Sequence, residues 1–311
     1  MATFEGELLS TCRHPVSACN LAPDSGNVIG SHVVEDVVVS IRFGEPRRGL
    51  ALRAAEAEPP EGRLGWTEGA NQPYSIDTMN DFDPFINDIY AYCEDQGIRI
   101  DTLSQEAGPA QFEINFLHGN AVDLADQVFL FKRTVREAAI EHEMHATFLA
   151  KPMSEDAGSA LHIHQSVVDK QGNNIFSTPE GEPSELFYNF LGGLQRYMPD
   201  AMLVFAPYVN SYRRFLNPWD SPVNLAWAID KRTVGLRVPD AAPDARRIEN
   251  RIAGSDVNPY LVIAATLACG YLGMVEGLKA SDPITGSPSR ACCSSATHMS
   301  TRWTTTASHR C

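Results

Sequence analysis

Four short segments of the chain alternate apolar and ionisable residues, and this alternation restricts the possible folds more than any other feature. They are "QFEINF" (111–116), "GSALHIHQS" (158–166), "TVGLRVP" (233–239) and "RRIENRI" (246–252). Successive side chains of a β-strand point to opposite faces, so the alternation predicts four strands with one apolar and one charged face each. Taken singly, such a charged face ordinarily meets water, whereas a curved antiparallel sheet would gather all four in one cavity.

The charged faces carry the residue types of a metal-dependent site. They hold Glu113, His162, His164, Ser166, Arg237, Arg247, Glu249 and Arg251, with Glu106 across a Gly-Pro turn from the first strand. Carboxylates with an imidazole suit Mg²⁺ or Mn²⁺, because hard cations prefer oxygen ligands. Arginines suit a phosphate or carboxylate substrate, which a guanidinium grips through two hydrogen bonds. The residues alone therefore indicate a metal-dependent site for anions. They leave open whether the histidines bind a metal, contact a phosphate or face water.

The remaining periodic segments predict helices, so the expected fold class is α+β. Apolar residues recur at helical spacing in 80–97, 121–143 and 184–198, whereas 33–43 is a further predicted strand. Because these strands and helices do not alternate strictly along the chain, the pattern favours α+β over a parallel α/β sheet.

Composition narrows the class of protein. The formal net charge of −14 argues against nucleic acid as a partner, because nucleic acids bind basic surfaces. Seven cysteines without a CxxC pattern indicate reduced thiols, and the N-terminal sequence lacks a secretion-signal pattern, so we expect a cytoplasmic protein. The apolar stretch 260–275 is shorter than the roughly 20 residues that cross a bilayer. It predicts a buried core helix, with Asn258 as its cap and Pro259 at its first position, and no membrane partner.

Seven blocks, in order between residues 74 and 280, resemble the glutamine synthetase family. They are "EAGPAQFEINF", "DQVFLFKRTVREAAIEHEMHATFLAKP", "GSALHIHQS", "NSYRRF", "SPVNLAWAIDKRTVGLRVP", "RRIENRIAGSDVNPYL" and the core helix after it. The resemblance implies a catalytic domain whose curved antiparallel sheet is flanked by helices. It also implies an N-terminal β-grasp domain, which is expected here to be absent or only a remnant. We therefore divide the chain into an atypical N-terminal segment (1–70), a catalytic domain (71–286) and a disordered tail (287–311).

The same resemblance implies an ATP-dependent ligase that forms a γ-glutamyl amide through γ-glutamyl phosphate. Its substrates would be ATP, glutamate and either ammonia or an organic amine. Two or three Mg²⁺ or Mn²⁺ ions would bridge ATP and glutamate, and the subunits would assemble into a homo-oligomeric ring. Carried over by motif, Glu106 and Glu113 would bind one metal ion, while His162 and Glu249 would bind another.

The resemblance also assigns the residues that would contact the substrates. Those implied for ATP are His164, Ser166 and Arg232. Those implied for glutamate are Gly158, Arg214 and Arg251. Those implied for catalysis are Asp220, Arg232 and Arg237.

Two positions depart from the ammonia-using members of the family. Asp220 of "NPWDSP" stands where those members place a catalytic glutamate on a flap, and "DAGS" replaces their "NGSG" loop. These changes, together with the amino-acid sequence of residues 74–97, resemble more closely the branch that joins glutamate to polyamines or other amines.

The family also has a Glu-x-Glu strand upstream of the matched region, which supplies one ligand to each metal. The nearby pair of this form is Glu56 and Glu58, which prolines follow where an apolar strand should continue. We interpret that pair as a solvated loop, with the metal pair as the alternative. An alternative for the whole chain is a truncated, weak or inactive homologue that retains at most nucleotide or metal binding. A small metal-binding barrel with hydrolytic activity would explain the histidines but not the seven ordered blocks.

Overall fold

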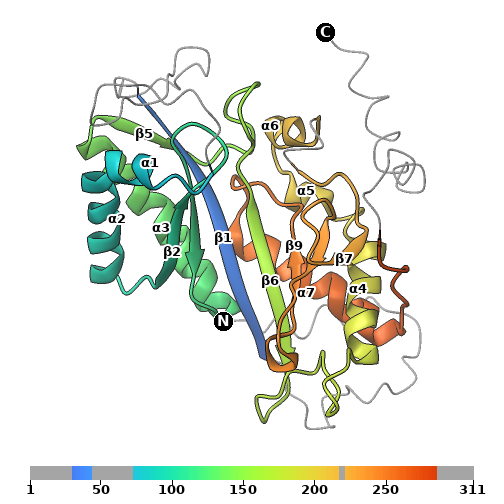
Figure 1. Ribbon diagram of the computed structural model, residues 1–311. Helices are drawn as coiled ribbons and strands as arrows, with labels where there is room; N and C mark the ends of the chain where they lie inside the picture. The colour runs from blue at the N-terminus through green and yellow to red at the C-terminus, as the bar shows by residue number, and fades with distance from the viewer. Residues whose placement is uncertain (1–29, 44–72, 217–220, 286–311) are drawn as a thin grey trace, which may run out of the picture.

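The computed structural model describes residues 30–43, 73–216 and 221–285, and nine strands in these ranges form one sheet (Figure 1). The main path of the sheet runs in the order β2-β3-β1-β6-β9-β8-β7, and β4 and β5 also pair with β1. Two long strands, β1 (Gly30–Phe43) and β6 (Leu161–Val168), lie side by side through the middle of the molecule. The other strands are β2 (Ile100–Gln105), β3 (Gln111–Phe116), β4 (Gly119–Asn120), β5 (Met144–Thr147), β7 (Trp227–Ile229), β8 (Leu236–Val238) and β9 (Ile248–Asn250).

The four strands that the alternation predicts are present as β3, β6, β8 and β9, and the α+β class is confirmed. The sheet is antiparallel except between β7 and β8, which pair in parallel within the part of the chain described here. The strand expected at 33–43 is β1. Although β1 falls within the segment 1–70, it pairs with β3 on one side and β6 on the other. The boundary drawn at residue 70 therefore does not separate β1 from the catalytic sheet.

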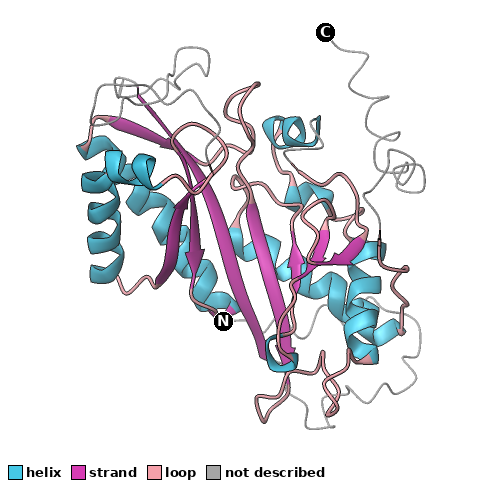
Figure 2. Ribbon diagram, in the orientation of Figure 1, coloured by secondary structure: helices cyan, strands magenta, loops and turns pink. Residues whose placement is uncertain are grey.

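In the view of Figure 2, helices lie to the left and to the right of the two long strands. Their bounds are α1 (Ile76–Asp81), α2 (Asp83–Asp95), α3 (Ala121–Glu141), α4 (Glu185–Tyr197), α5 (Met202–Phe205), α6 (Val209–Arg213) and α7 (Pro259–Glu276), with 3-10 turns η3 (Arg214–Leu216) and η4 (Pro243–Ala245). The three predicted helices correspond to α2, α3 and α4, and the apolar stretch to α7. Asn258 caps α7 as predicted, since its side chain accepts a hydrogen bond from the backbone N–H of Leu261.

The apolar face of the sheet packs against the helices to form the core. Phe112, Ile114 and Phe116 alternate along β3 and are almost fully buried. Phe116 meets Phe131 of α3 edge to face, with 5.1 Å between the ring centroids. Because the core occupies this face, the opposite face of β3 and β6 is the one left for polar side chains.

Helices α4 and α7 cross at glycines. A Cβ on Gly193 of α4 would lie 2.3 Å from the Cys269 carbonyl oxygen and 2.7 Å from the Gly273 Cα of α7. This close approach holds α7 against the rest of the domain, and α7 also contacts α3. By length and composition α7 is apolar enough to cross a bilayer, but its buried residues pack against these helices. The predicted core helix is therefore confirmed.

Several predictions fall outside the described residues. They concern Asp220, the pair Glu56 and Glu58, the N-terminal segment other than β1, and the tail 287–311.

Candidate functional site

The pairing of β6, β9 and β8 brings the predicted histidines, a glutamate and an arginine into one row. His164 of β6 lies opposite Glu249 of β9, and Glu249 lies opposite Arg237 of β8. His162 is two residues before His164 on the same face, and its Nδ1 is 3.5 Å from Oε1 of Glu249. The sheet therefore assembles residues that are 87 positions apart in the sequence.

Glu249 is the centre of this cluster. Its side chain is 1% exposed, and its Oε2 accepts a hydrogen bond from Nη1 of Arg237 at 2.6 Å. Its Oε1 accepts a hydrogen bond from Nη1 of Arg251. A buried carboxylate is costly unless it is paired, and here two guanidinium groups compensate it. Burial opposes the charged form of Arg237, but its hydrogen bonds to Asp230 and Glu249 raise its pKa above the usual value.

His162 is surrounded by positive charge. Burial, followed by the charges of Arg251 and Arg214, lowers the pKa of His162 well below its usual value. The imidazole is therefore neutral near pH 7 and keeps a nitrogen lone pair, which is the form that binds a metal ion.

His164 has a partner that the sequence did not assign to the site. The Nε of Arg247 donates to Nδ1 of His164 at 3.3 Å, so the neutral His164 carries its proton on Nε2. The sequence places Arg247 on the same charged strand face as Glu249, and this shared face is the signal that could have identified Arg247 as a site residue. Ser166 continues the same face of β6 and is half-buried.

The second predicted metal pair lies across β1, on β2 and β3. Glu113 of β3 accepts a hydrogen bond at Oε1 from Nδ2 of Asn115 at 3.2 Å. Glu106 follows β2, and its Oε2 accepts from the backbone N–H of Ala107 at 3.0 Å. Within the described residues no three His, Cys, Asp or Glu side chains gather closely enough to hold a metal ion. His162 and Glu249 therefore lie together as a pair, whereas the pairing of Glu106 with Glu113 stays a prediction.

Two further contacts involve the predicted catalytic arginines. Arg237 donates to Oδ1 of Asp230, a residue with a backbone φ of +50° just after β7. Arg232 donates to the hydroxyl of Tyr74 at 3.5 Å, and this hydrogen bond, together with the charge of Glu113, raises the pKa of Arg232. Neither Asp230 nor Tyr74 was predicted. Asp230 lies just after β7 and Tyr74 just before α1, where no alternation marks them.

Gly158 and Arg214 lie in contact with each other. A Cβ on Gly158 would come within 3.0 Å of the Ala150 carbonyl oxygen and 3.0 Å of the Arg214 Cγ. Arg214 is 1% exposed and donates to the carbonyls of Ile252 at 2.8 Å and Arg251 at 3.2 Å. It thus fixes the backbone after β9, and its role in glutamate binding stays a prediction.

The residues on β6 and β9 fit a divalent cation in spacing and chemistry. Two neighbouring ligand atoms of an octahedral cation, each bonded at about 2.1 Å, lie about 3 Å apart. The 3.5 Å between Nδ1 of His162 and Oε1 of Glu249 is close to that value. A neutral imidazole beside a carboxylate is also a donor set that suits Mn²⁺ or Mg²⁺.

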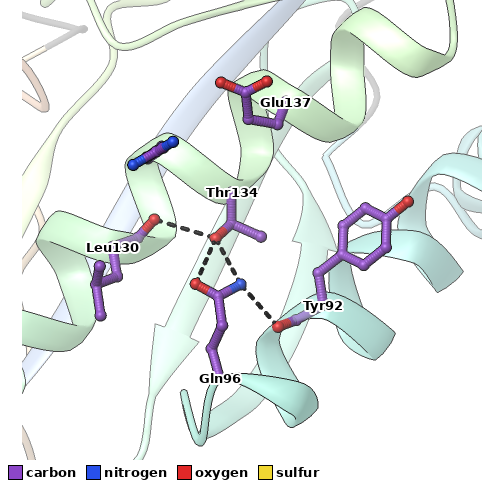
Figure 3. Close-up of a pocket in the computed structure, with 6 residues that line it drawn as sticks. Tyr92, Gln96, Leu130, Thr134 and Glu137 are labelled. Atoms are coloured by element: carbon purple, nitrogen blue, oxygen red, sulfur yellow. Dashed lines mark hydrogen bonds between the residues drawn. The ribbon is translucent and has the colours of Figure 1, made fainter.

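A separate hollow of about 280 Å³ opens between α2 and α3 (Figure 3). It is lined by Tyr92, Gln96, Leu130, Arg133, Thr134 and Glu137. The Gln96 amide bonds to the Tyr92 carbonyl oxygen at 2.8 Å and the Thr134 hydroxyl at 3.0 Å. None of the predicted site residues lines this hollow.

Comparison with known protein families gives one match that spans most of the chain. The profile described as glutamine synthetase, catalytic domain, matches residues 46–305.

Characterised relatives and solved structures agree with that match. The chain is 44% identical over 209 residues to gamma-glutamylputrescine synthetase PuuA of Escherichia coli K12, covering 67% of this chain and 43% of that protein. It is 38% identical over 221 residues to glutamate–isopropylamine ligase of a Pseudomonas species, covering 70% and 48%. A solved GmaS/ADP complex superposes with a TM-score of 0.70 at 27% identity, covering 83% of this chain and 58% of that one. The chain thus spans about half the length of these characterised relatives.

Proposed function

The chain belongs to the glutamine synthetase catalytic-domain family, and from that premise we propose that it is an ATP-dependent ligase forming γ-glutamyl amides. The observation that carries the proposal is the cluster around Glu249, where a neutral histidine and two arginines meet on one sheet face. Such a cluster joins a cation-binding pair to groups that bind anions, as transfer of a phosphoryl group requires.

In the proposed reaction a γ-carboxylate oxygen of glutamate attacks the γ-phosphorus of ATP, and ADP leaves. The amine nitrogen then attacks the γ-carbonyl carbon of the acyl phosphate, phosphate leaves, and the nitrogen loses a proton as the amide forms. Arg237 and Arg232 would face the transferring phosphoryl group, and Arg251 and Arg214 would hold glutamate. His164, oriented by Arg247, would contact ATP phosphates together with Ser166.

Divalent ions would supply charge neutralisation between ATP and glutamate when bound. We assign Mg²⁺ or Mn²⁺ to His162 and Glu249, and a second position to Glu106 and Glu113. The donor set of oxygen atoms and one imidazole supports this class of ion. In this scheme the chain itself supplies a neutral imidazole, from His162, and a carboxylate, from Glu249, that Arg237 and Arg251 hold in place.

We further propose that the acceptor is an organic amine rather than ammonia. Two relatives that cover about two thirds of this chain are named for putrescine and isopropylamine. We also infer a cytoplasmic enzyme that assembles as a homo-oligomeric ring.

The experiment that tests the proposal measures phosphate release by the purified chain with ATP, Mg²⁺ and glutamate. We expect release when putrescine, isopropylamine or another amine is added, and little release without one. Glu249→Gln should abolish the stimulation, whereas Asp126→Asn, on the surface of α3 and bonded to Tyr260, should retain it. If a folded chain shows no stimulation by any amine or by ammonia, the ligase proposal fails. The chain would then be an inactive homologue.

A further inference from the structure

The side chain of Gln111 connects two parts of the site that lie far apart in the sequence. Gln111 is the first residue of β3 and is 1% exposed. Its Oε1 accepts a hydrogen bond from the backbone N–H of Gly108 at 2.9 Å. Its Nε2 donates to the carbonyl oxygens of Gly158 at 3.2 Å and Ala157 at 3.4 Å, and to Oγ of Ser159 at 3.2 Å. One buried amide thus joins the turn before β3 to the loop before β6.

The bonding partners fix the orientation of this amide. A backbone N–H can only donate and a carbonyl oxygen can only accept, so the amide oxygen of Gln111 faces Gly108 and the amide nitrogen faces Gly158. A Cβ on Gly108 would lie 2.9 Å from Oε1 of Gln111, so the turn packs directly against the amide. Because a buried amide is costly without hydrogen bonds, the position of the side chain depends on the turn and the loop together.

The turn that Gln111 holds carries Glu106. The backbone N–H of Glu106 donates to the carbonyl oxygen of Gln111 at 2.7 Å, and the N–H of Gln111 donates to that of Gly108 at 3.2 Å. Nε2 of Gln105 also donates to the Gly108 carbonyl oxygen, at 3.0 Å. Gln111 lies two residues before Glu113, on the same face of β3. The turn is therefore fixed relative to the polar face of that strand.

The loop 157–159 is also held from a second direction. A Cβ on Gly158 would come within 3.0 Å of Cγ of Arg214, whose side chain is buried. The backbone N–H of Ser159 donates to the Ala150 carbonyl oxygen at 2.9 Å, and the Ser159 carbonyl oxygen accepts from the N–H of Ser255 at 3.1 Å. The loop thus contacts Arg214 and the strands on one side, and the bonds from Gln111 attach it to the turn of β3.

We propose that Gln111 is a positioning residue, which sets the loop of Gly158 against the turn of Glu106 and thereby shapes the place where glutamate binds. This rests on the proposed function for the identity of the substrate. Two of the bonds end on backbone carbonyl oxygens, so they do not depend on the side chain at position 157. Because Gln111 acts through the loop, its loss should raise the KM for glutamate and leave the KM for ATP near the wild-type value.

The test measures amine-stimulated phosphate release by the full chain while glutamate and ATP are varied in turn. Gln111→Met removes every hydrogen bond of the amide at nearly constant volume. It should raise the KM for glutamate about tenfold and the KM for ATP less than about twofold. Gln195→Met is the matched control, because the Gln195 amide also accepts from a backbone N–H, that of Ser281, and donates to the Ser281 hydroxyl and the Leu225 carbonyl oxygen. That variant loses the same kinds of bonds and should keep both KM values.

Gln111→Glu separates the two ends of the amide and serves if Gln111→Met does not fold. An ionised carboxylate still accepts from the N–H of Gly108 but cannot donate to the loop. We expect the same rise in the KM for glutamate, with faster hydrogen exchange in the loop 157–159 and unchanged exchange in the turn 106–110. Gln195→Met should change exchange in neither segment, and thermal unfolding checks that each variant is folded.

The outcomes separate this inference from the ligase proposal. An unchanged KM for glutamate in Gln111→Met, or an equal rise in Gln195→Met, would overturn the inference and leave the ligase proposal standing. If the folded wild type releases no phosphate with any amine or with ammonia, the ligase proposal fails and hydrogen exchange decides the positioning of the loop. Faster exchange confined to the loop in Gln111→Glu would uphold that positioning, and unchanged exchange would overturn it as well.

Discussion

The two sides of β1 hold their charges in different ways. On the side of β6 and β9, Glu249 is 1% exposed and is compensated by Arg237 and Arg251 within the chain. On the side of β2 and β3, Glu113 and Glu106 are half-buried, and they accept hydrogen bonds from an asparagine amide and a backbone N–H respectively. The difference teaches that the first side compensates its buried carboxylate with charged groups of the chain, whereas the carboxylates of the second side accept hydrogen bonds from neutral donors.

Energetics explain why the first side must keep its arrangement. Removing one partner of a buried ion pair costs about 3–5 kcal/mol, because the remaining charge stays buried without compensation. A half-buried carboxylate that is bonded to a neutral group carries a much smaller penalty. The two sides should therefore respond very differently to the same substitution.

The largest expected effect comes from neutralising Glu249. Glu249→Gln leaves Arg237 and Arg251 facing each other without their shared carboxylate, so we expect a loss of about 3 kcal/mol in the free energy of unfolding. Glu113→Gln, the same change on the other side, should cost less than about 1 kcal/mol. Urea denaturation in the presence of a chelator measures both. Equal losses in the two variants would remove the contrast between the sides.

Local patterns predicted the elements of this site, but not their partners. The alternation in 111–116 and 246–252 identified β3 and β9 and placed Glu113 and Glu249 on polar faces. The two-residue period of a strand shows only which residues share a face. It therefore placed Arg247 on the face of Glu249, but it could not predict the hydrogen bond from Arg247 to His164. That bond depends on the pairing of β6 with β9, which are far apart in the chain.

The site residues that were not predicted lie outside the segments with a regular pattern of apolar and polar residues. Asp230 and Tyr74 both have positive φ values, and each reaches an arginine from the end of a regular element. The position of β1 was missed for another reason. The segment 33–43 was predicted to be a strand, but the neighbours of a strand are set by tertiary packing rather than by its own sequence. The resemblance pointed to Glu56 and Glu58 because these two residues have the Glu-x-Glu spacing of the family's metal-binding strand.

The next prediction uses the protonation of His162. Because its pKa is lower in the folded chain than in the unfolded chain, the unfolded state binds more protons below about pH 6.5, and stability falls as the pH falls. Acidification from pH 7.5 to pH 5.5 should therefore lower the free energy of unfolding through this group.

His162→Asn should lose that part of the pH dependence, as measured by urea denaturation at both pH values with a chelator present. His118→Asn, on the connection between β3 and β4, is the matched control and should keep the wild-type dependence. If the wild type and His162→Asn lose the same stability on acidification, His162 is already accessible to protons in the folded chain. The first side would then be less closed than its contacts indicate.

The smallest expected effect concerns the outer partner of Arg237. Asp230 is 56% exposed, and exposed ion pairs contribute about 0.2–1 kcal/mol, so Asp230→Asn should reduce the free energy of unfolding by less than about 1 kcal/mol. The exposed Asp240, just beyond β8, provides the control Asp240→Asn, which should change stability less. Because Glu249 alone still holds Arg237, adding 0.5 M salt should weaken the effect of Asp230→Asn but not that of Glu249→Gln. A loss in Asp230→Asn as large as in Glu249→Gln would mean that the carboxylate on the rim, rather than the buried one, fixes the arginine. On the first side, the exposed Asp230 rather than the buried Glu249 would then determine the position of Arg237.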